Sequence, residues 1–160
     1  PVMVAKSGDI LLQEDARDAV KNLLIPHAAV VTPNNSEAEI LTGHKITNDD
    51  EAISAGKEII DMGASAVLMK GGHRGFGKIR DILIHPGGIN IFESPRQDSR
   101  NTHGTGCTLS SAIAVGLGQK LDLVTAVQRA HFYVQEAIRL APNFGKGNGP
   151  LNHVFGVHEI

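Results

Sequence analysis

The stretch AAVVTPNNSEAEILTGHKITNDDEAISAGKEIIDMGASAVLM, residues 28–69, decides the fold class. It begins with the apolar run AAVVT and ends with AVLM, and neither run alternates with polar residues, which is typical of parallel strands covered on both faces. Between them, the spacing of apolar residues predicts a short helix over 36–41 and a second helix between a capping-box signal at Thr47 and a glycine stop at Gly63. Strand, helix, helix and strand in this order predict an α/β domain.

The flanking segments extend this pattern. Apolar residues at helical spacing over 12–24 predict a helix that Pro26 ends, and residues 1–5 resemble the tail of a buried strand. After the quoted stretch, two short β runs at 79–84 and 89–92 are separated by His-Pro-Gly-Gly, which predicts a hairpin. A long helix is expected near the C-terminus.

Charge and composition exclude several classes of protein. The 160 residues contain 15 Lys and Arg against 17 Asp and Glu, and the formal charge of −2 argues against nucleic-acid or membrane-surface binding by bulk charge. No apolar run approaches the roughly 20 residues of a membrane span. A single cysteine, Cys107, forms no internal disulfide, so the cytoplasm is the expected compartment. Without repeats or a linker, residues 1–160 are expected to form a single domain.

The segment NTHGTGCTLSS, residues 101–111, is the strongest candidate for a functional site. Gly104, Thr105 and Gly106 precede a helix of mostly small residues, whose first amides and positive dipole end would bind an anion such as phosphate. Cys107 falls in the first turn, where the same field stabilises a thiolate. The alternative is that the turn only starts a helix and that Cys107 is a small buried apolar residue.

A glycine-rich run over 70–78 invites comparison with a phosphate-binding P-loop. The spacing G-x-x-x-x-G-K is present, but Ile79 replaces the required hydroxyl and a β pattern follows instead of a helix. The P-loop interpretation therefore fails. Lys70, at the carboxyl end of a parallel-type strand, remains a candidate phosphate ligand, unless it is simply an exposed lysine.

Asn34 and Glu37 follow the other predicted parallel strand. Their oxygens suit magnesium, bound directly or through water, although residues of these types are also ordinary helix caps. Taken together, a carboxylate, a lysine and an anion-binding turn at three strand ends form the parts of a phosphoryl-transfer site. The eight histidines show no spacing of a transition-metal site, and a Cys107–His103 nucleophile lacks an orienting third group.

At these residues the chain resembles the hydroxymethylpyrimidine/phosphomethylpyrimidine kinases of thiamine biosynthesis, which belong to the ribokinase superfamily. The resemblance runs nearly end to end, through PVMVAKSGD, VVTPNNSEAEILTG, VLMKGGH, NTHGTGCTLSSAIA and GKGNGPLNH. It implies a three-layer ribokinase-like fold with a mostly parallel central sheet and a C-terminal β-hairpin. It also implies a homodimer.

The resemblance further implies ATP- and Mg²⁺-dependent phosphorylation of a hydroxymethylpyrimidine and then of its monophosphate. Gly104, Thr105 and Gly106 match the anion hole, and Cys107 matches the position of the catalytic base. Asn34 and Glu37 match the magnesium and phosphate motif, and Lys70 and Thr102 are expected near ATP. Val2 matches a residue of the pyrimidine pocket.

Family members carry roughly a hundred further residues before the part that matches Pro1. The chain is therefore expected to be the C-terminal, nucleotide-side portion of a kinase domain, without its N-terminal part, and turnover by that portion alone would be in doubt. Two alternatives stay open. One is a pyridoxal or pyridoxine kinase, and the other is a phosphate- or nucleotide-binding remnant without catalytic activity.

Overall fold

The structure, a computed structural model, describes residues 1–4, 10–71 and 77–156. The chain divides into two compact units, Pro1–Glu93 and Ser94–Ile160, and each is described by itself. Of the described residues, no helix is both long enough and apolar enough to cross a membrane.

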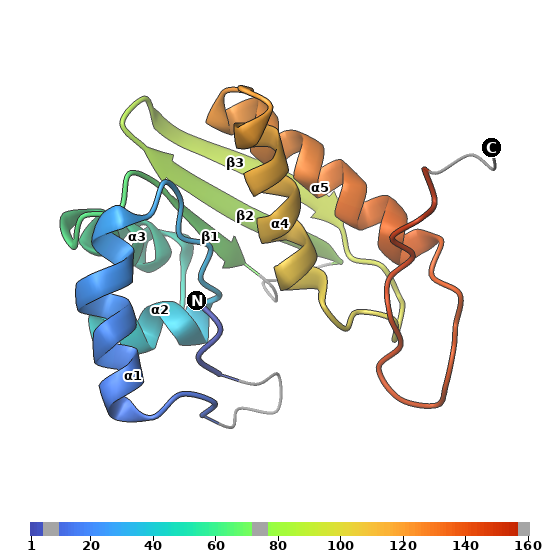
Figure 1. Ribbon diagram of the computed structural model, residues 1–160, viewed down its shortest axis with the longest axis horizontal. Coiled ribbons are helices and arrows are strands. Elements are labelled where there is room, and N and C mark those ends of the chain that lie inside the picture. Colours follow the sequence, from blue (N-terminus) through green and yellow to red (C-terminus); the bar gives the residue numbers. More distant parts are fainter. Residues whose placement is uncertain (5–9, 72–76, 157–160) are drawn as a thin grey trace. The chain divides into compact units, whose positions relative to one another are not determined.

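The first unit contains the sheet (Figure 1). Strands β1 (Val67–Gly71), β2 (Lys78–His85) and β3 (Gly88–Pro95, whose end passes into the second unit) are ordered β1-β2-β3. The pairing of β1 with β2 is antiparallel and places Lys70 opposite Asp81. The strand order also places β3 beside β2, which confirms the hairpin expected at 79–92; its turn is Pro86 and Gly87, and Gly88, the first residue of β3, has φ 123°.

The parallel sheet expected from the sequence is present only as a fragment among the described residues. Residues 28–32 form no regular strand, but Val31 and Asn34 make isolated parallel bridges with Val67 and Lys70. The bond from Lys70 N–H to the Pro33 carbonyl, at 2.8 Å, continues this pairing. Pro33 has no N–H to donate and a helix begins at Asn35, so the pairing stops after a few residues.

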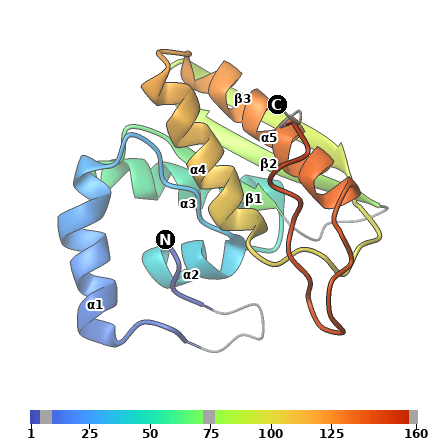
Figure 2. The same cartoon turned by 45° about the vertical axis from the view of Figure 1, so that its right-hand side comes forward.

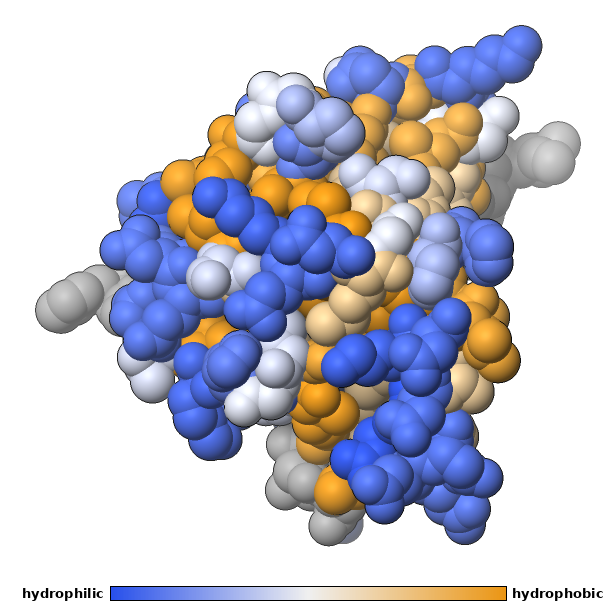
Figure 3. Space-filling view, turned by 90° about the vertical axis from the view of Figure 1, so that its left-hand side faces the viewer, coloured by the Kyte–Doolittle hydropathy of each residue, from blue (hydrophilic) through white to orange (hydrophobic). Residues whose placement is uncertain are grey.

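The first helical segment only partly follows its predicted pattern. Helix α1 (Glu14–Ala19) continues as a π-helical turn over Val20–Leu24 and a 3₁₀ turn over Ile25–His27. Leu23 and Leu24 were expected on the buried face but are 66% and 63% exposed. The π-helical turn changes the number of residues per turn, which rotates these side chains off the stripe that begins at Leu12. Figure 3, which faces the side on which α1 lies, shows apolar surface between hydrophilic side chains.

Two further helices complete the first unit. Helix α2 (Asn35–Thr42) ends at Gly43, whose φ of 79° gives the left-handed cap expected there. Helix α3 (Asp49–Asp61) is capped by Asn48, which accepts the Glu51 N–H, and not by Thr47 as the sequence suggested. The buried face of α3 packs on the sheet and on α2. Its buried residues join a core that includes Met3, Ile25, Val31, Leu41, Ala52, Ile59, Val67, Met69, Ile82 and Ile84.

The second unit is built on two long helices. Helices α4 (Thr105–Gly118) and α5 (Leu123–Arg139) pack side by side, as both Figure 1 and Figure 2 show. The small residues of α4 allow this close approach: a Cβ added at Gly116 would lie 2.8 Å from the Cβ of Ala126. Asp122 caps α5 by accepting the Thr125 N–H at 3.0 Å.

Candidate functional site

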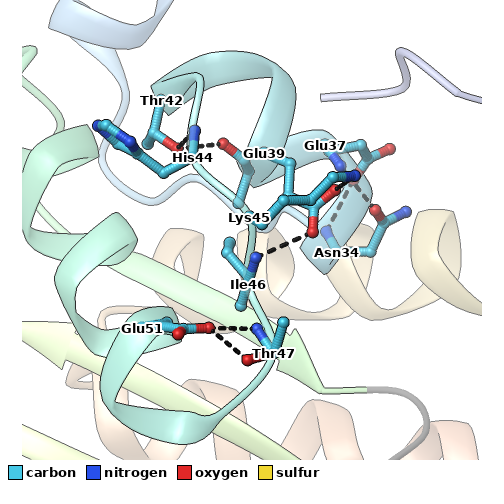
Figure 4. A network of polar contacts seen from close by, with 10 residues as sticks. Asn34, Glu37, Glu39, Thr42, His44, Lys45, Ile46, Thr47 and Glu51 are labelled. Atoms are coloured by element: carbon cyan, nitrogen blue, oxygen red, sulfur yellow. Dashed lines mark hydrogen bonds and ion pairs between the residues drawn. The ribbon is translucent and has the colours of Figure 1, made fainter.

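The start of α2 holds Asn34 and Glu37 in a reciprocal capping box (Figure 4). Asn34 Oδ1 accepts the Glu37 N–H at 2.9 Å, and Glu37 Oε2 accepts the Asn34 N–H at 2.8 Å. The capping role, the alternative to metal binding, is thus present. It uses one oxygen of each side chain. Glu37 is only 4% exposed, and its Oε1 takes no part in the hydrogen bonds between described residues.

Lys70 lies directly beside Asn34. The two residues form a parallel bridge, and Lys70 is half-buried where β1 ends. The structure therefore brings together Asn34, Glu37 and Lys70, as expected of groups at the carboxyl ends of neighbouring strands. An amide, a carboxylate and an ammonium at one sheet edge can bind a metal-phosphate group.

Asp81 supports this edge and was not predicted from the sequence. It is 5% exposed, faces Lys70 across the antiparallel pair, and accepts the Gly71 N–H at 2.9 Å through Oδ1. The signal was present as one acidic residue inside the apolar run IRDILI. Gly71 is also sterically required, since an added Cβ would lie 1.9 Å from the Arg80 carbonyl oxygen.

The remainder of the glycine-rich run, residues 72–76, lies outside the described residues. Strand β2 begins at Lys78, directly after Gly77. A P-loop requires a helix at that point, so the strand confirms that this run is not one.

The turn that was predicted to bind an anion lies at the start of α4 in the second unit. Gly104 has φ 81° and stands at the N-cap of α4, and no side chain in the described part of the chain caps this helix. The Thr105 hydroxyl donates to the Thr102 carbonyl at 2.8 Å, and the Thr108 N–H donates to the Gly104 carbonyl at 2.9 Å. The Thr105 N–H donates to the Thr102 carbonyl at 3.4 Å, so among these first residues the Gly106 and Cys107 amides and the positive end of the helix dipole are the groups left to face an anion.

Cys107 is exposed in this first turn. The expectation in the alternative that Cys107 is buried is therefore wrong. Thr102, which was expected near ATP, contributes a backbone carbonyl to the turn. His103 is fixed through its backbone, because its N–H donates to the Gly149 carbonyl at 3.2 Å and it forms a parallel bridge with Pro150.

The loop before α4 rests on the C-terminal segment. Asn101 is 2% exposed and its Nδ2 donates to Asn143 Oδ1. Gly149 packs so closely that an added Cβ would lie 2.0 Å from Asn101 Oδ1. His153 Nε2 lies 3.0 Å from Thr108 Oγ1. Asn101 and His153 were not predicted as functional, since only their place within the motifs NTHGTGC and GPLNH pointed to them.

Two further expectations concern Val2 and metal binding. Val2 is 62% exposed, next to Met3, which is fully buried. Within the described ranges, no three His, Cys, Asp or Glu side chains gather as a metal-binding cluster. A magnesium site at Asn34 and Glu37 would therefore take further ligands from a bound nucleotide.

The loop between α2 and α3 is held by acidic side chains (Figure 4). Glu39 accepts Lys45 Nζ and the Ile46 N–H, both at 2.9 Å. The hydrogen bond from Lys45, together with the weaker effect of that from Ile46, lowers the pKa of Glu39. Thr47 donates its hydroxyl to Glu51 at 2.8 Å, and the bonds from Thr47 lower the pKa of Glu51. These contacts fix α2, and with it the capping box.

Comparison with solved structures defines the class of protein. Pyridoxal kinase from Staphylococcus aureus in complex with AMP-PCP matches with a TM-score of 0.86 and 30% identity, over 96% of this chain and 56% of that one. Phosphomethylpyrimidine kinase from Clostridium difficile 630 matches with a TM-score of 0.74 and 40% identity, over 86% of this chain and 55% of that one. The fold is therefore the α/β fold of the ribokinase-like kinases.

The chain belongs to the phosphomethylpyrimidine kinase family, because the family model matches residues 1–152. Its sequence is 45% identical over all 160 residues to the thiamine biosynthesis bifunctional protein ThiED of Geobacter sulfurreducens, and covers 33% of that protein. The resemblance seen in the sequence motifs is thus confirmed. The chain spans between a third and about half of the length of these relatives.

Proposed function

We propose that this chain supplies the nucleotide-side groups of a kinase that phosphorylates a hydroxymethylpyrimidine and then its monophosphate, using ATP and Mg²⁺. The observation that carries the proposal is the turn at Gly104, with an exposed Cys107 at the open N-terminus of α4. Family membership supports the choice of substrate, since the relatives carry the names of pyrimidine kinases.

The amides of Gly106 and Cys107 would bind the transferring phosphoryl group, joined by the Thr105 amide once it leaves its long 3.4 Å bond to the Thr102 carbonyl. In the reaction, the bond between the γ-phosphorus and the bridging oxygen to the β-phosphate breaks, and a new bond forms to the acceptor oxygen. Backbone N–H groups that are already oriented stabilise the negative charge of this group without reorganising.

Lys70, Asn34 and Glu37 would act on the nucleotide's other charges. The half-buried Lys70 ammonium would bind a phosphate oxygen. Glu37 would hold Mg²⁺ directly or through water, and its Oε1 fits this role because the capping box uses only Oε2. Asn34 would position Glu37. Mg²⁺, when bound, would neutralise phosphate charge.

Cys107 would take the proton from the acceptor hydroxyl in the first transfer. For the second transfer the acceptor is already a phosphate anion, so a base matters less.

Val2 would line the pyrimidine pocket. We also propose that the parallel pairing at Val31 and Asn34 belongs to a mostly parallel sheet, and that the enzyme is a cytoplasmic homodimer of single-domain chains.

A pyridoxal kinase is the second candidate, and the TM-score of 0.86 with the Staphylococcus aureus enzyme favours it. Measuring kcat/KM for both substrates, with a full-length kinase that contains residues 1–160, separates the two candidates. We expect kcat/KM to be higher for hydroxymethylpyrimidine than for pyridoxal, and the reverse order would favour the second candidate. Nucleotide binding without turnover of either substrate would indicate a binding remnant.

In the same enzyme, Cys107→Ala tests the role of the thiol. We expect it to reduce the first transfer more than the second. Equal losses in both steps would contradict the proposed base. Ser111→Ala, an exposed position on the same helix, is the matched control and should leave both rates unchanged.

A further inference from the structure

The imidazole of His153 is held next to the anion-binding turn. Its Nε2 lies 3.0 Å from Thr108 Oγ1, and the same hydroxyl lies 2.9 Å from the Gly104 carbonyl oxygen. Backbone contacts fix His153 itself, because the Tyr133 hydroxyl donates to its carbonyl at 2.8 Å and the preceding Asn152 N–H donates to the Ala137 carbonyl at 2.9 Å. The ring is thus positioned by α5 and placed against the first turn of α4.

The single hydroxyl proton of Thr108 determines which group donates in its contacts with Gly104 and His153. A threonine hydroxyl has one proton to donate and two lone pairs that accept. The Thr108 hydroxyl donates to the Gly104 carbonyl, so its contact with His153 must be one in which it accepts. His153 therefore donates from Nε2, either as the neutral Nε2–H tautomer or as imidazolium. The result is a chain of two hydrogen bonds from His153 through Thr108 to Gly104.

This chain of hydrogen bonds ends at Gly104, the residue that gives the turn its shape. Gly104 is left-handed, with φ 81°, and its carbonyl accepts both the N–H and the hydroxyl of Thr108, each at 2.9 Å. Holding that carbonyl along the helix axis keeps the next amides directed out of the helix start. A threonine that bonds back to the carbonyl four residues earlier is common in helices. The contact with a histidine 45 residues away is the non-local addition to this common arrangement.

We infer that His153 is a positioning residue for phosphate binding: it orients Thr108, which fixes the Gly104 carbonyl and keeps the first-turn amides of α4 in place. The inference rests on the proposed function of that turn. His153 needs no contact with the nucleotide or the acceptor in this role. A donor of similar reach should therefore replace it, and a positive charge is not required.

The test compares His153→Ala with His153→Gln in the 160-residue chain. Glutamine keeps an N–H donor, so it should restore what alanine removes. Thr108→Val removes the hydroxyl that links His153 to Gly104 and changes the shape of the side chain little. His44→Ala, at an exposed position in the first unit, is the matched control. Two readouts are used: hydrogen exchange of the Thr108 amide without ligand, and the Kd values of Mg²⁺-AMP-PCP and of AMP.

We expect His153→Ala and Thr108→Val to accelerate exchange of the Thr108 amide about fivefold, and to raise the Kd of AMP-PCP by a similar factor, which corresponds to one lost hydrogen bond. The Kd of AMP should stay unchanged, because AMP lacks the γ-phosphate that the turn is proposed to bind. His153→Gln and His44→Ala should behave like the native chain. A purely structural role would move both Kd values together.

Three results would overturn the inference. They are an unchanged exchange rate in His153→Ala, an unchanged Kd of AMP-PCP in that variant while the native chain binds AMP-PCP, and no rescue by glutamine. Absence of AMP-PCP binding by the native chain would instead overturn the proposed function, and the positioning role with it. The two failures are therefore distinguishable in one set of titrations.

Discussion

Glu37 and Asn34 bind each other's backbone: Glu37 Oε2 accepts the Asn34 N–H at 2.8 Å, and Asn34 Oδ1 accepts the Glu37 N–H at 2.9 Å. The same carboxylate is therefore a helix cap and the proposed magnesium ligand. These two roles can be separated by substitution, because a cap requires an accepting oxygen whereas a cation also requires charge.

Glu37→Gln should keep the helix cap and lose the ability to bind Mg²⁺. We expect its free energy of unfolding to stay within about 0.5 kcal/mol of the native value, whereas Glu37→Ala should lose about 1 kcal/mol because the cap is removed. Both variants should lose the Mg²⁺ dependence of nucleotide binding. Urea denaturation and titration of AMP-PCP with and without Mg²⁺ measure the two effects. Full Mg²⁺ dependence in Glu37→Gln would contradict the ligand role.

Gly104→Ala tests the left-handed turn without steric interference, since nothing lies within 4 Å of the added Cβ. The φ of 81° should cost about 1 kcal/mol with alanine. Gly43→Ala is the matched control, because it has φ 79° and equally open space. Both variants should lose similar stability in urea, but only Gly104→Ala should weaken AMP-PCP binding. Equal affinities in the two variants would contradict the role of the turn.

Asp81→Leu should destabilise the edge of β1. The substitution leaves the Gly71 N–H, which Asp81 accepts at 2.9 Å, without that acceptor. A partly buried donor that loses its partner costs about 1–3 kcal/mol. Asp98→Leu, at an exposed position, should change the free energy of unfolding far less. Urea denaturation of the two variants provides the comparison, and equal losses would show that Asp81 does not support this edge.

Glu39 should make stability depend on pH. Its hydrogen bonds with Lys45 and Ile46 lower its pKa from the usual value near 4.5. A carboxyl with a lowered folded-state pKa stabilises the fold above its unfolded pKa, and this contribution is lost as the pH falls through the folded value. Glu39→Gln should therefore have a lower Tm than the native chain at pH 7, and the difference should vanish at acidic pH. A difference that persists below the folded-state pKa would show that the charge of Glu39 is not its cause.

Local rules predicted the parts of the fold that are set by neighbouring residues. Gly43, the hairpin glycines and the apolar face of α5 all follow from spacing and turn chemistry, and the structure confirms them. Leu23 and Leu24 departed from the prediction because a π-helical turn changes the period of the helix. The cap of α3 lies one residue after the predicted position, because Asn48 accepts the Glu51 N–H while Thr47 donates to the Glu51 carboxylate.

The candidate site divides in the same way. Asn34, Lys70 and Gly104 could be found from the sequence because each stands where a strand ends or a helix begins. Asp81 and His153 could not, because their roles come from partners 10 and 45 residues away. Their contacts appear only in three dimensions, where Asp81 accepts the Gly71 N–H and His153 lies beside Thr108.

Calorimetric titration of the 160-residue chain with AMP-PCP in the presence of Mg²⁺ tests the central claim most directly. We predict one binding event per chain, tighter than that of AMP and weakened by Gly104→Ala. Equal affinity for AMP and AMP-PCP, or no heat of binding for either, would contradict the claim that the helix start at Gly104 binds the terminal phosphate of a nucleotide.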